Sequence, residues 1–226
     1  MTPFAAGLTA QRSTLRQEAL ALVKHALLAG EFKPGRVLSA NAIATELGVS
    51  NSPVREALMD LVGQGLLEVV KNRGFRVREN TEDDRREIHE MRSILEVSAM
   101  QRLARRGLTA EESARARELC EGSLAPDRVD GRTNTVAYLD ADHEMHVYLV
   151  GLLGNSRLTA MVERLRDQTR VGGALVDLPR EQVTWYSSEH AALIDAIEAR
   201  DETTVGRLMQ RHLDAVHEHV ADDPTD

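Results

Sequence analysis

Apolar side chains recur every three or four positions along most of the chain, which is the spacing of one buried face of an α-helix. In the first 65 residues this spacing predicts three helices, each followed by a glycine suited to end it: Gly30, Gly48 and Gly65. The three stripes consist of Leu15, Ala19, Leu22, Val23, Ala26 and Leu27, then Ile43, Ala44 and Leu47, then Val54, Leu58, Leu61 and Val62. Because the second and third helices are separated only by a short turn, they predict a helix-turn-helix.

Two short apolar runs, 66–70 and 75–78, follow the third helix and flank Lys71-Asn72-Arg73-Gly74. Runs of this length around a glycine-containing turn predict two antiparallel strands. The turn between them is basic, so the pair resembles a wing with a positively charged tip. We therefore predict a winged helix-turn-helix over residues 8–78.

A polar connector, residues 79–83, leads into a second module over residues 84–222. Thr81 and Asp84 have the spacing of a helix capping box, and so do Thr109 and Glu112. A loop rich in polar residues, Gly and Pro is expected over 126–134. One long helix is predicted by the stripe Ile88, Met91, Leu95, Ala99 and Leu103. Strand patterns are absent after residue 79, so the predicted fold is mostly α, a winged helix-turn-helix followed by an all-helical bundle.

Polar residues interrupt the apolar stripes of three helices in this bundle. Asp142 and His146 lie one turn apart in line with core leucines, while His190 and His212 occupy inward positions on two later helices. Three imidazoles and one carboxylate that point inward predict a divalent-metal site. Each residue alone is also compatible with a core histidine satisfied by the backbone, or with a surface ion pair. Four inward residues on three helices favour the metal.

Arg92 is a further anomaly, because it lies on the edge of the apolar stripe of the long helix. A buried guanidinium requires a carboxylate partner. That partner is either Glu96, four residues further on, or the carboxylate of a ligand, and the sequence leaves both open.

The net charge of −8 over 226 residues hides two modules of opposite charge. Residues 1–78 carry 10 basic and 6 acidic side chains, whereas residues 79–226 carry 18 and 30. Because the phosphate backbone attracts basic surfaces, the first module is the one suited to nucleic acid. The single cysteine excludes a disulfide framework. Neither a membrane-length apolar run nor a signal-peptide pattern occurs, so we expect a cytoplasmic protein without membrane contact.

A highly specific run, Ser50-x-x-Pro53-Val54-Arg55-Glu56-Ala57-Leu58, begins the third helix. It is accompanied by Pro34-Gly35, Leu47-Gly48-Val49, Gly65-Leu66-Leu67 and Arg73-Gly74-Phe75-Arg76-Val77. Together these residues resemble the winged helix of the GntR family of bacterial transcription regulators. Asn51 stands where that family usually has an arginine that touches DNA, and Ala40 where it often has glutamate.

A recognition helix presents its first residues to base edges in the major groove and its free amides to phosphate. Arg55 at that end can read guanine or clamp a phosphate, and Asn51 can pair with adenine. The alternative is a helical hairpin that packs against a protein partner. The predicted DNA contacts are Asn41, Ser50, Asn51, Ser52, Arg55, Lys71, Arg73, Gly74 and Arg76.

A second resemblance rests on Met91-Arg92 with Glu96, Asp142-x-x-Met145-His146, Gly154-Asn155-x-x-Leu158, Glu189-His190 and His212-Leu213. These residues are similar to the FCD effector domain of the FadR-like branch of the same regulators. The resemblance implies that Asp142, His146, His190 and His212 hold a divalent ion and that a small carboxylate effector completes its coordination. It places Arg92 and Asn155 beside that effector. Zinc is our first choice of metal, with nickel, manganese or iron as alternatives. Acyl-CoA-binding relatives lack this metal set, which argues against a fatty-acyl effector.

We therefore predict a transcription regulator, not an enzyme, that binds a pseudo-palindromic DNA operator as a homodimer. A small organic acid at the metal site is expected to control its operator affinity. Two alternatives remain open. A metal-dependent hydrolase would need a general base, for which Glu189 and Glu144 are the nearest candidates. A regulator with a purely structural metal would melt without the ion, and no small acid would change its DNA affinity.

Overall fold

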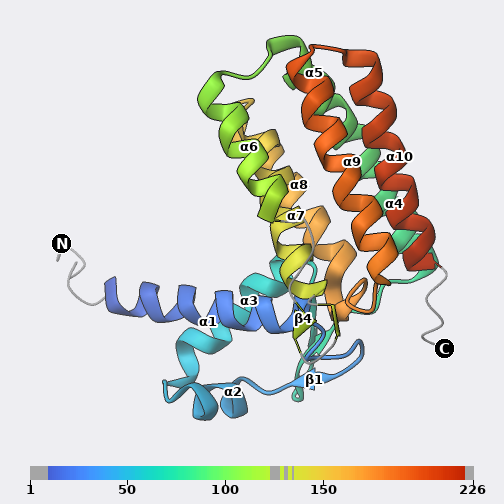
Figure 1. The fold of residues 1–226 in the computed structure, drawn as a ribbon. Helices are drawn as coiled ribbons and strands as arrows, with labels where there is room; N and C mark the ends of the chain where they lie inside the picture. Colours follow the sequence, from blue (N-terminus) through green and yellow to red (C-terminus); the bar gives the residue numbers. More distant parts are fainter. Residues whose placement is uncertain (1–9, 123–127, 130–131, 134, 222–226) are drawn as a thin grey trace. The chain divides into compact units, whose positions relative to one another are not determined.

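The computed structural model describes residues 10–122, 128–129, 132–133 and 135–221 (Figure 1). It divides into two compact units. One holds the chain as far as Glu79 together with Arg170–Ala174, and the other holds Asn80–Thr169 together with the chain from Leu175 onward. The predicted outer limits, residues 8 and 222, lie outside the described residues. Among the described helices, none is both long and apolar enough to cross a membrane.

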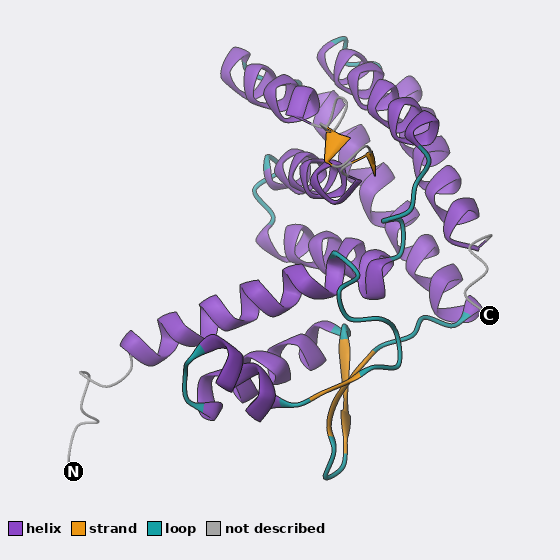
Figure 2. Cartoon of the chain, turned by 60° about the horizontal axis from the view of Figure 1, so that its bottom comes forward, coloured by secondary structure: helices purple, strands orange, loops and turns teal. Residues whose placement is uncertain are grey.

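The first unit is a winged helix-turn-helix, as the sequence predicts. Its helices are α1 (Ala10–Leu28), α2 (Ala40–Leu47) and α3 (Asn51–Gln64), and its strands are β1 (Val37–Leu38), β2 (Leu67–Val70) and β3 (Gly74–Val77). The strands form an antiparallel sheet in the order β1-β3-β2. Strands β2 and β3 form the narrow hairpin of the wing (Figure 2). Gly48 and Gly65 end α2 and α3 in the left-handed conformation that glycine adopts without strain.

The core of this unit joins the predicted helical stripes to the inner face of the sheet. Leu27, Leu58, Leu61 and Phe75 are among its fully buried side chains. Val171 also belongs to this core, although it follows the eighth helix of the chain in a short 3-10 turn, η2 (Val171–Gly173). The sequence does not predict that η2 packs with the first unit, because three residues are too few to carry a periodic pattern.

The second unit is the predicted helical bundle. Its helical segments are α4 (Glu82–Arg92), the π-helical turn η1 (Ser93–Val97), α5 (Ser98–Arg106), α6 (Ala110–Gly122), α7 (Thr135–Gly151), α8 (Ser156–Arg170), α9 (Arg180–Glu198) and α10 (Glu202–Ala221). Thr81 and Asp84 form the predicted capping box at the start of α4. Thr109 and Glu112 exchange the two equivalent hydrogen bonds before α6. The main core contains Met100, Leu103, Met145, Leu149, Ile194, Ile197 and Met209, all fully buried.

The prediction of one uninterrupted helix over 88–103 is wrong in one respect. A π-helical turn, η1, separates α4 from α5. Such a turn contains an extra residue and rotates the residues on either side of it around the helix axis. Met91, predicted to be buried, is therefore 42% exposed, whereas Arg92 and Glu96 are 5% and 0% exposed.

The expected loop over 126–134 also contains structure. Its described residues form a short antiparallel pair, β4 (Arg128–Val129) and β5 (Arg132–Thr133). The remaining residues of the loop, 126–127, 130–131 and 134, lie outside the described part of the chain. The sequence signal for the pair is Asp130-Gly131, a dipeptide typical of two-residue hairpin connections.

Candidate metal centre and DNA-binding surface

Asp142, His146, His190 and His212 meet in the interior of the bundle. They come from α7, α9 and α10, and one potential ligand atom from each lies within 4.8 Å of the others. The Oδ1 atom of Asp142 is 3.1 Å from Nε2 of His190, 3.6 Å from Nε2 of His146 and 3.9 Å from Nε2 of His212. None of the four residues is more than 8% exposed. The sequence thus predicts correctly that they converge, and we call them the Asp/His cluster.

Two carboxylates approach the opposite edges of the imidazole rings. Glu96 Oε2 lies 3.4 Å from Nδ1 of His146, and Glu189 Oε2 lies 3.5 Å from Nδ1 of His212. A carboxylate on Nδ1 favours the tautomer whose Nε2 lone pair is free, as in many metal-binding histidines. The pair of carboxylates therefore orients both rings with Nε2 toward Asp142.

Two buried arginines connect the same carboxylates. Arg166, on α8, donates to Glu96 at 2.8 Å through Nη1 and to Oδ2 of Asp142 through Nη2. Arg92 donates to Glu96 at 2.7 Å through Nε. Arg92 thus forms the internal ion pair that was one of the two readings of this residue. Since Arg166 binds Oδ2 of Asp142, Oδ1 is left facing the three imidazoles.

The charges in this network are set by burial and by the two guanidinium groups. Burial alone would raise the pKa of Asp142, but Arg166 holds it well below its usual range. Burial would likewise raise the pKa of Glu96, and Arg92 and Arg166 together reverse that effect. Burial, followed by the positive charge of Arg166, lowers the pKa of His146 to about 3. Burial also lowers the pKa of His212. The cluster therefore presents a charged carboxylate at Asp142 and neutral imidazoles at His146 and His212, the protonation states that metal ligands require.

The residues present fit a divalent ion. Both ring nitrogens of His146 and of His190, and Nδ1 of His212, are buried without a well-formed hydrogen bond among the described residues. Unsatisfied buried polar atoms are rare and costly. A cation among the Nε2 atoms and Asp142 Oδ1 would satisfy the inward-facing members of this set. Three imidazole nitrogens and one carboxylate oxygen suit zinc, nickel, manganese and iron.

Asn155, which the resemblance places beside an effector, does not reach the Asp/His cluster. It is exposed at the start of α8, where its Oδ1 accepts a hydrogen bond from the Leu158 amide at 3.2 Å. This geometry is that of a helix N-cap. Asn155 therefore caps α8 in this structure, and its place beside an effector stays a prediction.

Arg166 is the main residue that the sequence interpretation missed. It lies four positions after the fully buried Val162 on α8, so helical spacing would have placed it inward. Its exposed fraction is 4%. An inward arginine in line with an apolar stripe is the same signal that drew attention to Arg92.

The predicted DNA-contacting residues gather on α2, on the first turn of α3 and on the wing. Ser50 is the N-cap of α3 without a side-chain capping bond, and Arg55 is exposed on the first two turns. Ser52 donates to Glu56 at 3.0 Å. The Asn51 amide donates to Asn41, so these two side chains tie α3 to α2. The predicted DNA-contacting surface is thus partly ordered by hydrogen bonds within the protein.

Wing residues Lys71 and Arg73 are exposed at the tip of the hairpin. Arg76 differs, because it is partly buried and donates to Glu68 on the neighbouring strand at 2.8 Å. Gly74 has a φ of +124°, and a side chain there would overlap the carbonyl of Leu38. Gly74 therefore serves the pairing of β1 with β3.

These two units define a class of protein, a winged-helix transcription regulator with a helical bundle as its second domain. Residues 15–77 match the bacterial regulatory proteins of the gntR family, and residues 87–215 match the FCD domain. The chain belongs to the GntR family of regulators and carries an FCD domain at its C-terminal side.

Known relatives agree with this assignment. The Nta operon transcriptional regulator of Aminobacter aminovorans is 29% identical over 191 residues, which cover 84% of this chain and 88% of that protein. The HTH-type transcriptional repressor GlaR of Escherichia coli is 26% identical over 84% of this chain and 89% of its own length. The solved structure of E. coli McbR/YncC is 25% identical, with a TM-score of 0.75 over 90% of this chain and 97% of McbR.

Proposed function

We propose that this regulator changes its operator affinity when a small organic acid binds beside a divalent ion in the Asp/His cluster. The observation that carries the proposal is the convergence of Asp142, His146, His190 and His212 with their Nε2 atoms turned toward one carboxylate oxygen. We assign these four residues to the metal, with zinc as the first choice. A bound divalent ion would supply an open coordination position that attracts a carboxylate.

The chain's own residues would hold and orient the site. Glu96 and Glu189 keep the rings of His146 and His212 in place through Nδ1, and Arg166 holds the carboxylate of Asp142. Arg92 is 5% exposed, and its Nη2 donates to no described residue. This free donor supports Arg92 as a partner for an anionic effector.

We further propose that the first unit binds a pseudo-palindromic operator as part of a homodimer. The exposed residues at the start of α3 enter the major groove, and the wing tip contacts the backbone. Each head carries only a modest positive charge, so affinity depends on two heads held together and falls steeply with salt. The nine predicted DNA contacts keep their assignment, and Arg76 and Asn51 act partly by positioning their neighbours. In keeping with this role we assign the protein to the cytoplasm.

The test measures the metal, the effector and DNA binding in the same preparations. Metal content is determined by mass spectrometry for the wild type, for His190→Ala and for His219→Ala, a matched control outside the cluster. DNA affinity is then measured by fluorescence anisotropy with and without a panel of mono- and dicarboxylates. We expect His190→Ala to lose the metal and the carboxylate response, and His219→Ala to keep both.

Two other results would change the conclusion. If chelation melts the bundle and no acid alters DNA affinity, the metal is structural. If no divalent ion is bound by the wild type, the site fails as a metal centre.

The hydrolase alternative finds little support, because Glu144 is exposed in an ion pair with Arg115 and Glu189 lies between Arg211 and His212. Neither carboxylate is free to act as a general base.

A further inference from the structure

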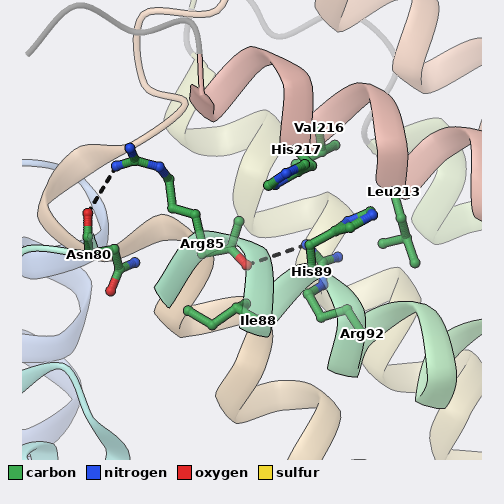
Figure 3. A pocket seen from close by; sticks show the side chains of 9 residues that line it. Asn80, Arg85, Ile88, His89, Arg92, Leu213, Val216 and His217 are labelled. Atoms are coloured by element: carbon green, nitrogen blue, oxygen red, sulfur yellow. Dashed lines mark hydrogen bonds between the residues drawn. The ribbon is translucent and has the colours of Figure 1, made fainter. Parts of the chain in front are cut away.

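A pocket separate from the Asp/His cluster lies between α4 and α10 (Figure 3). Its enclosed volume is about 20 Å³, and about 320 Å³ when the space open to solvent at its mouth is included. Figure 3 shows His89 and His217 side by side on the two helices, with Arg92 below them and Arg85 to one side. The complete lining is Asn80, Arg85, Ile88, His89, Arg92, Thr169, Leu213, Val216 and His217.

Most polar groups of this lining are engaged, but three nitrogen donors, on Arg85, Arg92 and His217, have no acceptor among the described residues. The Nε atom of Arg85 is buried without a partner among the described residues, although its two terminal nitrogens bind Asn80 and Glu82. Nη2 of Arg92 is likewise unengaged within the described chain. The ring of His217 stacks on His89 with centroids 4.5 Å apart, and among described residues it makes no hydrogen bond. Donors gathered without matching acceptors indicate a place for an acceptor from outside the chain.

The nine lining residues include two arginines and two histidines but no carboxylate. Three carboxylates beyond the lining offset this charge, because Glu82 pairs with Arg85, Glu96 with Arg92 and Asp214 with His89. Burial lowers the pKa of His89, and the neighbouring His217 and Arg92 lower it further, while Asp214 at 3.1 Å acts in the opposite sense. The nitrogen donors that these carboxylates leave without an acceptor are therefore what would hold an anion. Ile88, Leu213 and Val216 add an apolar wall.

We propose that the α4–α10 pocket is a second anion-binding site, which takes one carboxylate or phosphate group carried on a small apolar body. The anion accepts hydrogen bonds from Arg85 and His217, while the apolar body rests on Ile88, Leu213 and Val216. This site is distinct from the Asp/His cluster and does not rest on the metal. Arg92 lies between the two sites. Its Nε donates to Glu96 beside the Asp/His cluster, and the same guanidinium lines the α4–α10 pocket.

The experiment titrates butyrate, and separately inorganic phosphate, into the full-length protein by calorimetry at neutral pH in a buffer free of other such anions. The decisive variants are His217→Ala and Arg85→Ala. Their matched controls are His219→Ala on α10 and Arg86→Ala on α4, whose side chain is exposed and paired with Asp83. A hydrogen bond to a charged group accounts for about a tenfold change in affinity. We expect each pocket variant to weaken binding by at least about tenfold and each control to leave it unchanged. Unfolding curves are measured for all four variants to establish that each of them folds. If Arg85→Ala does not fold, the result for His217→Ala decides the matter.

The two probes distinguish the sources of the anion. Binding of butyrate alone identifies an organic acid, and binding of phosphate alone identifies a phosphate group; either result supports the site. The His190→Ala protein, which lacks a cluster ligand, should still bind the probe. Loss of binding in that variant would place the anion at the metal centre and overturn the second site while leaving the proposed function intact. Absence of any binding up to about 50 mM, the affinity that about 0.3 kcal/mol per atom gives for the six heavy atoms of butyrate, would also overturn it.

Discussion

Replacing Arg166 by methionine removes the guanidinium that joins Glu96 to Asp142 inside the bundle. Methionine has a similar length, so the change mainly removes charge and donors. Glu96 keeps its ion pair with Arg92 at 2.7 Å, whereas Asp142 is left facing the three imidazoles. The greater part of the cost therefore comes from Asp142.

The size of the effect follows from this asymmetry. Removing one partner of a buried ion pair typically costs about 3–5 kcal/mol, because the other charge stays buried alone. Since one of the two carboxylates keeps a partner, we expect about 4 kcal/mol without metal, or a midpoint lower by about 10 °C for a unit of this size. In the wild type the depressed pKa of Asp142 adds stability that is present above the ordinary carboxyl range and is lost as pH falls. In the variant Asp142 is expected to have a raised pKa, so the deficit should shrink as pH falls.

The assay is urea and thermal unfolding of metal-stripped full-length protein, repeated with added zinc. Arg157→Met, at an exposed position on the same helix, is the control and should change stability by less than about 0.5 kcal/mol. Zinc should reduce the loss of unfolding free energy in Arg166→Met, because a cation at the cluster would take the place of the guanidinium as the partner of the Asp142 carboxylate. A loss below about 1 kcal/mol would refute the reasoning, since it would mean that water already screens these charges.

Four further substitutions and one chemical labelling test other parts of the structure. Gly74→Ala places a side chain against the carbonyl of β1 at positive φ and should lower DNA affinity in anisotropy measurements. Gly63→Ala, in open space on α3, should leave that affinity unchanged and slightly stabilise the fold. Phe75→Ala, at 2% exposed, should cost about 3–5 kcal/mol in denaturant unfolding, and a smaller loss would indicate a loosely packed wing. Thr81→Ala removes the capping box of α4 and should cost about 1 kcal/mol in the same assay. Burial raises the pKa of the Cys120 thiol, so iodoacetamide should label the folded protein at least about tenfold more slowly than the urea-unfolded chain; equal rates at mildly alkaline pH would contradict its burial.

The sequence by itself determined the class of each module and the membership of the Asp/His cluster. Periodicity alone places Asp142 and His146 on one face of α7, because residues four apart always share a helix face. Capping boxes at Thr81 and Thr109 are equally local, and both were predictable from spacing. The motif that begins with Ser50 identified the winged helix, because its residues serve a local turn and a short amphipathic helix.

Only the tertiary structure decided what surrounds these residues. The π-helical turn at 93–97 rotates Met91 outward and brings Glu96 under His146, and a stripe counted at 3.6 residues per turn does not reveal that shift. Arg166, Glu189 and the pocket between α4 and α10 depend on how distant helices pack, and η2 joins a core formed 90 or more positions earlier in the chain. Asn155 is the opposite case, because its hydrogen bond is local. The resemblance predicts it beside an effector, whereas in the structure its side chain caps the start of α8. Local spacing within a regular α-helix determines which residues share a face, whereas their partners are set by long-range packing that no single helix encodes.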